Sequence, residues 1–213
     1  MAARPERTRH HYRGRMARVD EVSEALLRAA GDVLAAEGPG ALTVRRIAHE
    51  AGISTINVYS RFGGKEGLLE QLYLEGFRRL ADAMNAVPAT DDPLGDLLHG
   101  GLAYRQFALE NTTYYAVMFD RAVPEFEPSP DTQIAATATL ELLAAMVQRV
   151  VAAGVFAPVD GLHTAATIWA ACHGAMSLEL KSVGPPQVDW ERVYQQMMVM
   201  VARGLSSETR RDG

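Results

Sequence analysis

Apolar residues recur along the chain at the three- and four-residue spacing of amphipathic α-helices, and from residue 94 onward no strand pattern interrupts them. The first such segment spans residues 20–36 and ends before Gly38, Pro39 and Gly40, which stop a helix. Two shorter segments follow on either side of the sequence AGIS at residues 51–54. The pattern predicts an all-α protein that begins with three helices.

The two short segments have the layout of a helix-turn-helix motif. Thr43 can cap the first helix with its hydroxyl. Gly52 can end that helix, because glycine takes a left-handed conformation without steric cost. Ser54 or Thr55 can cap the second helix, which the pattern ends near residue 62 with Val58 turned inward. A helix with this polar outer surface is suited to the major groove of DNA.

Nine polar residues in and beside the motif are predicted to contact DNA. Hydroxyl, amide and guanidinium groups hydrogen-bond phosphates and base edges, and a lysine at a helix start suits a phosphate. They are Thr43, Arg45, Ser54, Thr55, Asn57, Tyr59, Ser60, Arg61 and Lys65. Paired amphipathic helices with a glycine turn also occur in proteins that bind no DNA, so the helices and turn alone leave the function open.

Residues of about 22–70 resemble the DNA-binding domain of the TetR family of bacterial transcription regulators. The matching residues are Thr43, Ile47, Ala48, Ala51, Gly52, Ile53, Ser54, Tyr59, Phe62, Lys65, Glu66 and Leu68. The resemblance implies an all-helical dimer that binds a palindromic operator and usually leaves it when a small molecule binds. Gly64 stands where the family often has Ser, Asn or Asp, and is a weaker helix cap. Arg61 replaces a frequent His and keeps the charge for a phosphate contact.

Charge is distributed unevenly along the chain. The formal net charge of −5 at pH 7 argues at first against a nucleic-acid partner. Residues 1–65, however, hold eleven Lys and Arg against seven Asp and Glu, whereas the remainder holds ten against nineteen. Basic charge therefore coincides with the helix-turn-helix motif, as binding to DNA requires. Residues 1–18 include six arginines, and we expect an arm that is disordered without DNA; whether it contacts DNA stays open.

The rest of the chain predicts a second helical domain. We place the helix-turn-helix domain at residues 19–65 and a linking helix at 66–87, before the break PATDDP at 88–93. Residues 88–206 are predicted to form a helical ligand-binding and dimerisation domain, followed by a tail at 207–213. Its helices are expected near residues 93–110, 113–120, 131–153, 160–182 and 189–205.

The last two predicted helices are apolar on two faces, which is typical of helices buried on two sides. One face can pack within the domain and the other on a second copy of the chain, which gives a four-helix bundle. The alternative is that both faces belong to the core of one chain. The residues assigned to the dimer interface are Ala165, Ile168, Cys172, Ala175, Tyr194, Met198 and Val201. A two-fold dimer would also place two recognition helices on a palindrome.

Part of the second domain resembles a TetR subfamily with a Trp-x-x-x-His-Gly motif, here WAACHG at residues 169–174, and NTTYYAVMF at 111–119 is similar to the same subfamily. The resemblance implies a ligand in the middle of the domain without naming it. Apolar walls with few polar groups suit a hydrophobic small molecule, although such residues are more often plain core. A buried His173 would need a hydrogen-bond partner. The candidate lining residues are Tyr104, Phe107, Tyr114, Met118, Met146, Trp169, His173 and Met176.

No group of residues indicates an enzyme, a metal or a cofactor. Cys172 and His173 are adjacent on a predicted helix and point about 100° apart, so they cannot act as nucleophile and base. His163 lies about 15 Å from His173 along that helix, too far to share a metal. The single cysteine and the absence of a run of about 20 apolar residues suggest a cytoplasmic protein without a membrane span.

These patterns together predict a sequence-specific DNA-binding transcriptional regulator. The simplest form is a homodimeric repressor that binds a palindromic operator in double-stranded DNA and is released by a small hydrophobic effector. Two alternatives remain: a transcriptional activator, or a helical dimer that acts mainly through a protein or ligand partner.

Overall fold

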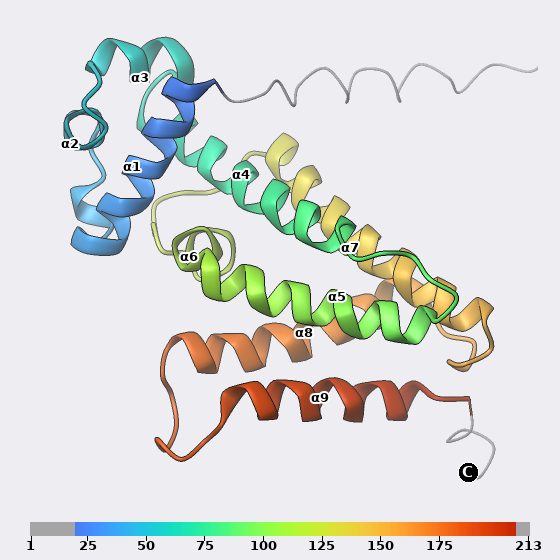
Figure 1. Ribbon diagram of the computed structural model, residues 1–213. Coiled ribbons are helices and arrows are strands. Elements are labelled where there is room, and N and C mark those ends of the chain that lie inside the picture. The colour runs from blue at the N-terminus through green and yellow to red at the C-terminus, as the bar shows by residue number, and fades with distance from the viewer. Residues whose placement is uncertain (1–19, 208–213) are drawn as a thin grey trace, which may run out of the picture. The chain divides into compact units, whose positions relative to one another are not determined.

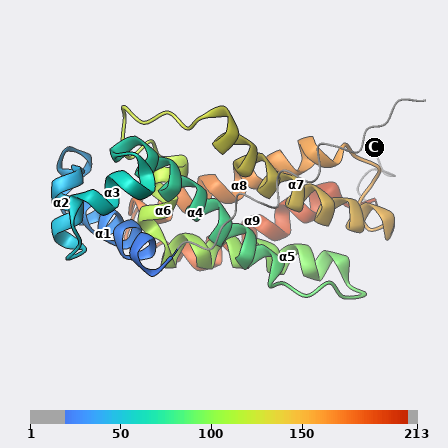
Figure 2. The ribbon, with the colours of Figure 1, turned by 90° about the horizontal axis from the view of Figure 1, so that it is seen from above.

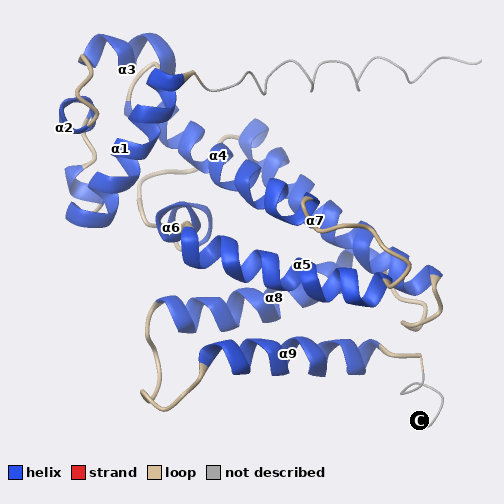
Figure 3. Ribbon diagram, viewed as in Figure 1, coloured by secondary structure: helices blue, strands red, loops and turns tan. Residues whose placement is uncertain are grey.

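The helical periodicity of the sequence is realised in the computed structural model, which describes residues 20–207 (Figure 1). Nine α-helices and one short 3-10 turn at Pro39–Ala41 make up the regular structure of this range (Figure 3). The predicted all-α fold is confirmed. The expected arm at residues 1–18, and all of the expected tail but its first residue, lie outside the described range. The helices are α1 (Glu21–Glu37), α2 (Val44–Glu50), α3 (Thr55–Phe62), α4 (Lys65–Asn85), α5 (Pro93–Glu110), α6 (Thr112–Phe119), α7 (Pro130–Ala152), α8 (Gly161–Leu180) and α9 (Trp190–Leu205).

The chain divides into two compact units, Met1–Gln71 and Leu72–Gly213. The division falls inside α4, between Gln71 and Leu72. The helix expected to link two domains therefore contributes its first turns to one unit and its remainder to the other.

The first unit is built on α1, which packs against α2 and α3. Asp20 caps α1, because its carboxylate accepts a hydrogen bond from the Ser23 N–H at 2.8 Å. Leu26 and Ala30 of α1, Ile47 of α2 and Val58 of α3 are completely buried. Burying a side chain of leucine or isoleucine size contributes roughly 1.5–3 kcal/mol, so this core holds the short α2 and α3 in place.

The second unit is a bundle in which α8 packs on α7, α9 and α5. Figures 1 and 2 show α8 and α9 running side by side, with α5 along the same bundle. Its core cluster consists of Leu97, Val147, Val150, Phe156 and Ala165, which come from α5, α7, the connection after it, and α8. Apolar residues on these helices therefore meet one another within the unit.

Within residues 20–207, α7 is the one helix whose length and composition would allow it to cross a membrane, and a single helix of this kind is weak evidence for a span. It packs on α5 and α8. Its residues Val147 and Val150 are completely buried in the core of the second unit.

Candidate functional site

The turn of the helix-turn-helix motif follows from its local sequence. The Thr43 hydroxyl accepts a hydrogen bond from the Arg46 N–H at 3.1 Å and caps α2. Gly52 has φ of 65°, in the left-handed region that favours glycine. Ser54 occupies the position before α3, but its side chain forms no cap; instead the Asn57 amide donates to the Ser54 hydroxyl at 3.0 Å. The motif thus forms as predicted, except for the role of Ser54.

Two glycines separate α3 from α4. Gly63 has φ of 73° and its N–H donates to the Tyr59 carbonyl, which ends α3. Gly64, which replaces the residues more frequent in the family, has φ of 136° and is buried. A serine, asparagine or aspartate would be strained at that φ. The departure from the family pattern therefore has a backbone reason.

The predicted DNA-binding residues gather on and beside α3. Val58 is fully buried, and the outer side of the helix is left to solvent. Tyr59 is 59% exposed. Asn57 and Lys65 are partly buried, and the others are exposed: Thr43, Arg45, Ser54, Thr55, Tyr59, Ser60 and Arg61. Their contact with DNA stays a prediction.

Arginines of this unit differ in what they bind. Arg61 forms an ion pair with Asp20 at 3.2 Å, and both side chains are partly open to solvent. Hydrogen bonds from Ser23, and to a lesser degree Arg61, hold the pKa of Asp20 below its ordinary value. Arg46 donates to Glu37 at 2.6 and 3.0 Å and to Glu50 at 2.7 Å. Arg46 therefore braces α2, whereas Arg45 beside it is exposed.

One exposed residue of α3 was not among the predicted DNA contacts. Ile56 is 75% exposed, in the middle of the polar side of α3. It lies two positions before the buried Val58, which places it about 160° away around the helix. That spacing could have identified it from sequence. An exposed apolar side chain on a recognition helix can contact the thymine methyl group in the major groove.

The second unit contains a cavity of about 340 Å³. Residues of six helices, α4 to α9, and Phe156 line it. None of the described residues that line it carries a charged side chain. Six lining residues have a polar or thiol group: Tyr73, Tyr104, Thr137, Thr139, Trp169 and Cys172. Both threonine hydroxyls donate to backbone carbonyls one turn earlier in α7, at 3.1 and 2.7 Å. The cavity therefore suits a largely apolar, uncharged molecule.

Three of the eight predicted lining residues border this cavity: Tyr104, Met118 and Trp169. The other five were wrongly placed in its wall: Phe107, Tyr114, Met146, His173 and Met176. Phe107 and Met176 are buried without bordering the cavity, and Met146 packs at Gly100. The guanidinium of Arg79 lies over the Tyr114 ring at 4.4 Å. His173 binds Tyr115 instead, as described below.

One wall of the cavity comes from α4, which sequence reasoning had treated only as a link. Tyr73, Phe77, Leu80 and Met84 are buried and border the cavity. They recur at intervals of four, three and four residues, and so share one face of the helix. Phe77 also packs edge-on against Phe119 of α6, with ring centroids 5.6 Å apart. The apolar stripe was present in the sequence, but its partner surface was not identifiable there.

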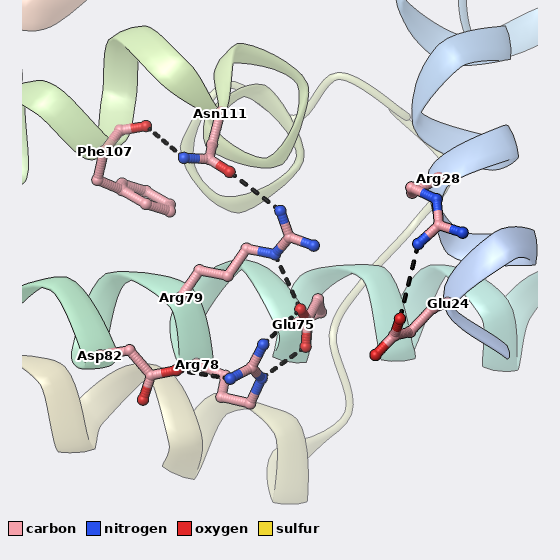
Figure 4. A network of polar contacts seen from close by, with 8 residues as sticks. All are labelled: Glu24, Arg28, Glu75, Arg78, Arg79, Asp82, Phe107 and Asn111. Atoms are coloured by element: carbon pink, nitrogen blue, oxygen red, sulfur yellow. Dashed lines mark hydrogen bonds and ion pairs between the residues drawn. The ribbon is translucent and has the colours of Figure 1, made fainter. Parts of the chain in front are cut away.

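A second face of α4 carries a network of charged groups (Figure 4). The buried Glu75 carboxylate accepts from Arg78 at 2.7 Å twice and from Arg79 at 2.8 Å. Burial alone would raise the pKa of Glu75, but these arginines outweigh it and hold the pKa below its ordinary value. Arg79 also donates to Asn111, at the start of α6, at 3.2 Å, and the Asn111 amide donates to the Phe107 carbonyl. The network thus fastens α4 to the junction of α5 and α6.

His173 belongs to a chain of hydroxyl groups. Its Nδ1 lies 2.7 Å from the Tyr115 hydroxyl, which is 3.2 Å from the Tyr104 hydroxyl. The Tyr115 and His173 rings are stacked, with centroids 5.7 Å apart. Burial lowers the pKa of His173, and it raises the pKa of Tyr104 and that of Tyr115, the latter to about 12. All three groups are therefore neutral near pH 7.

The residues assigned to the dimer interface lie mostly inside the protomer, which corrects that assignment. Ala165 and Tyr194 are completely buried and Cys172 nearly so. The Tyr194 hydroxyl donates to the Gly101 carbonyl at 2.8 Å. Ile168, Met198 and Val201, like Cys172, border the cavity, and Ala175 is partly buried. On helices apolar all round, sequence alone does not tell the inner face from the outer.

Potential metal ligands are dispersed. Within residues 20–207, no three His, Cys, Asp or Glu residues come together as a metal site. His163 is exposed and pairs with Asp160, the cap of α8, at 2.9 Å.

The fold and the exposed helix α3 define a helix-turn-helix protein that carries a separate helical domain with a cavity. Two family models match the chain: "Bacterial regulatory proteins, tetR family" at residues 26–72, and "Tetracyclin repressor-like, C-terminal domain" at residues 97–201. The chain belongs to the TetR family, and it is a DNA-binding transcriptional regulator. The finer resemblance to the Trp-x-x-x-His-Gly subfamily stays a prediction.

Solved structures share this fold at low sequence identity. A protein of unknown function from Rhodococcus sp. RHA1 has a TM-score of 0.77 and 24% identity, over 91% of this chain and 100% of that one. PfmR, a TetR family transcriptional regulator from Thermus thermophilus, has a TM-score of 0.67 and 23% identity, over 85% of this chain and 98% of that one. FadR, a fatty acid degradation regulator from Bacillus halodurans, has a TM-score of 0.71 and 18% identity, over 87% of this chain and 97% of that one. No curated protein matches the chain.

Proposed function

We propose that this regulator is a homodimeric repressor that binds a palindromic operator and is released by a small, uncharged, largely apolar effector. The observation that carries the proposal is the pairing of an exposed recognition surface on α3 with an apolar cavity in the other unit. The first suits DNA, and the second suits a small molecule.

The DNA contacts are assigned to the outer surface of α3 and its flanks. Thr55, Asn57, Tyr59 and Ser60 supply hydrogen-bonding groups for phosphates and base edges. Ile56 supplies an apolar contact for a thymine methyl group. The excess of basic residues in residues 1–65 supports this assignment, because phosphate contacts require positive charge.

The chemistry of the effector is argued from the cavity wall. A charged group would lose its hydration there without gaining an ionic partner from the described lining residues. An uncharged molecule with a long or broad apolar part loses little by comparison. FadR from Bacillus halodurans, which has the same fold, is a regulator of fatty acid degradation. A lipid-like effector is therefore a reasonable first class to test, with its polar end uncharged.

The dimer is assigned to the outer faces of α8 and α9. Leu178 of α8 is 44% exposed, and Val199 and Met200 of α9 are 42% and 71% exposed. Ala170 and Gly174 are small residues that are also exposed on α8. Small residues allow two helices to approach closely, and the two exposed faces could form a four-helix bundle with a second copy.

Release is assigned to α4, the one helix that belongs to both units. Four residues of α4 border the cavity, while its first turn carries Lys65 beside the recognition surface of the same unit. An effector that fits the cavity better when α4 is displaced would shift the protein toward that state. Such a shift would change the spacing of two recognition helices in a dimer.

A catalytic role has no support from the two residues that would be its best candidates. Cys172 is buried, and burial raises the pKa of its thiol. His173 is bound to Tyr115. We place the protein in the cytoplasm, because its DNA partner is there.

The test is fluorescence anisotropy with the purified protein and duplexes that tile the DNA around its own gene, with a shuffled duplex as competitor. We expect saturable binding to one palindromic duplex by two chains, weakened steeply by salt. Addition of an uncharged lipid-like compound should release the DNA. Equal, weak binding to every duplex would contradict sequence-specific regulation at that locus.

A further inference from the structure

The hydroxyl chain His173–Tyr115–Tyr104 connects a half-buried histidine to the wall of the apolar cavity. Tyr115 is completely buried and Tyr104 is 6% exposed. The chain is held by ring packing as well: Tyr115 stacks on His173 and packs edge-on against Tyr104, with centroids 6.2 Å apart. Such an arrangement is more than is needed to satisfy one histidine.

The direction of the hydrogen bonds follows from chemistry. A phenol is a better donor than acceptor and a neutral imidazole nitrogen is a strong acceptor, so Tyr115 donates to Nδ1 of His173 across 2.7 Å. The Tyr115 oxygen then accepts from the Tyr104 hydroxyl. The Tyr104 hydroxyl therefore donates its proton to Tyr115, and an oxygen lone pair of Tyr104 remains available to a molecule in the cavity, which Tyr104 lines.

We propose that Tyr104 recognises a hydrogen-bond donor on the effector, so that the cavity selects an apolar alcohol over the corresponding ketone. His173 and Tyr115 are positioning residues, because they fix the direction of the Tyr104 hydroxyl without lining the cavity. This inference rests on the proposed function, since it assumes that the cavity binds the effector. A ketone would require the Tyr104 proton to leave Tyr115, which costs one buried hydrogen bond.

A variant that reverses the direction of the hydrogen bond between Tyr104 and Tyr115 gives the sharpest test. In His173→Phe the Tyr115 hydroxyl loses its acceptor and turns to the Tyr104 oxygen. The Tyr104 proton then points into the cavity, and a ketone becomes the better partner. A merely structural role for His173 would weaken both ligands equally. Tyr104→Phe removes the recognition group itself, and Tyr73→Phe, which removes another hydroxyl of the cavity wall, is the matched control.

The experiment compares 2-octanol with 2-octanone by isothermal titration calorimetry. Intrinsic fluorescence is measured in parallel in a Trp190→Phe background, where Trp169 of the cavity wall is the one tryptophan left. Thermal unfolding confirms that each variant is folded. We expect wild type and Tyr73→Phe to bind 2-octanol about ten-fold more tightly than 2-octanone. Tyr104→Phe should bring the two within about two-fold, and His173→Phe should reverse the preference.

Two results would overturn the inference. Equal affinity for both probes in wild type, or a preference that survives Tyr104→Phe, would remove Tyr104 as the recognition group and leave the cavity as an effector site. Binding of neither probe up to its solubility limit would contradict the apolar effector cavity of the proposed function, and this inference with it. If His173→Phe does not fold, Tyr115→Phe tests the same step, because it also frees the Tyr104 proton and should favour 2-octanone.

Discussion

The candidate DNA surface comes from one helix and its flanking turns, whereas the cavity is lined by six helices spread over residues 73–205. On α3 most of the candidate DNA-binding side chains are exposed, and a single buried residue, Val58, anchors the helix. In the cavity the lining residues are themselves part of the hydrophobic core, as Phe77 and Leu97 are. Substitutions in the candidate DNA surface should therefore have little effect on the stability of the fold, whereas substitutions in the cavity wall should lower it.

The largest expected effect separates binding from folding at the DNA surface. Replacing Tyr59, Arg61 and Lys65 by alanine together should weaken operator binding at least about 1000-fold, because phosphate and base contacts are lost at once. Thermal unfolding should shift by no more than about 1–2 °C, since the Tyr59 side chain is exposed and the ion pair of Arg61 with Asp20 is open to solvent. Anisotropy and calorimetry measure the two quantities. Unchanged operator affinity would overturn the site assignment.

For the cavity wall we predict the opposite, a large loss of stability, in the variant Phe77→Ala. Phe77 is 5% exposed and packs against Tyr73 and Phe119, so its loss should reduce the free energy of unfolding by about 3–5 kcal/mol. Urea denaturation measures this. A matched change on the DNA surface, Ile56→Ala, should leave the unfolding free energy within about 0.5 kcal/mol. A small cost for Phe77→Ala would mean that the cavity wall is not part of the core.

Substitution of Ile56 tests how much an apolar contact contributes to recognition of the DNA sequence. Ile56→Ala should weaken binding to the operator about three- to ten-fold, because contact with a thymine methyl is lost. The loss should disappear when uracil replaces that thymine, which removes the methyl group from the DNA instead. Anisotropy with substituted duplexes gives the comparison. A loss of equal size on every duplex would place Ile56 outside base recognition.

The smallest expected effect is a pH dependence within the cavity unit. Hydrogen bonds from the Thr90 N–H and hydroxyl, and then Arg149, hold the pKa of the buried Asp96 below its ordinary value of 3.8. Its ionised form therefore stabilises the fold above about pH 3.8, and this contribution is lost as pH falls through the lower, folded-state pKa. Asp96→Asn should be less stable than wild type near neutral pH, and the gap should close in acid. Urea denaturation from pH 7 to pH 2 would reveal a constant gap if this is wrong.

The contrast between the two units also explains what could be predicted from sequence. The helices and the helix-turn-helix motif are specified locally: Gly52 and Gly63 end their helices, and the apolar spacing gives the inner faces. The cavity depends on which of several apolar faces meet in space. On α8, apolar all round, periodicity placed Trp169 correctly in the cavity wall but also placed His173 there, and it placed the buried Cys172 in a dimer interface.

The charged network on α4 likewise could not be predicted from the sequence. Glu75, Arg78 and Arg79 have the spacing of an ordinary exposed helix surface. The structure buries Glu75 and carries Arg79 across to Asn111, 32 positions away in the chain. A long-range partner of this kind leaves no trace in local periodicity, so neither the network nor the cavity wall on α4 was predicted.

The way α3 is anchored has a consequence for how such regulators diversify. Because Val58 holds the helix while Thr55, Ile56, Tyr59 and Ser60 face outward, their codons can change with little effect on the fold. After a gene duplication, a few substitutions there would let one copy leave the parental operator and acquire another. The cavity residues would be inherited nearly intact, so sister proteins should diverge in the genes they control before they diverge in the molecules they sense.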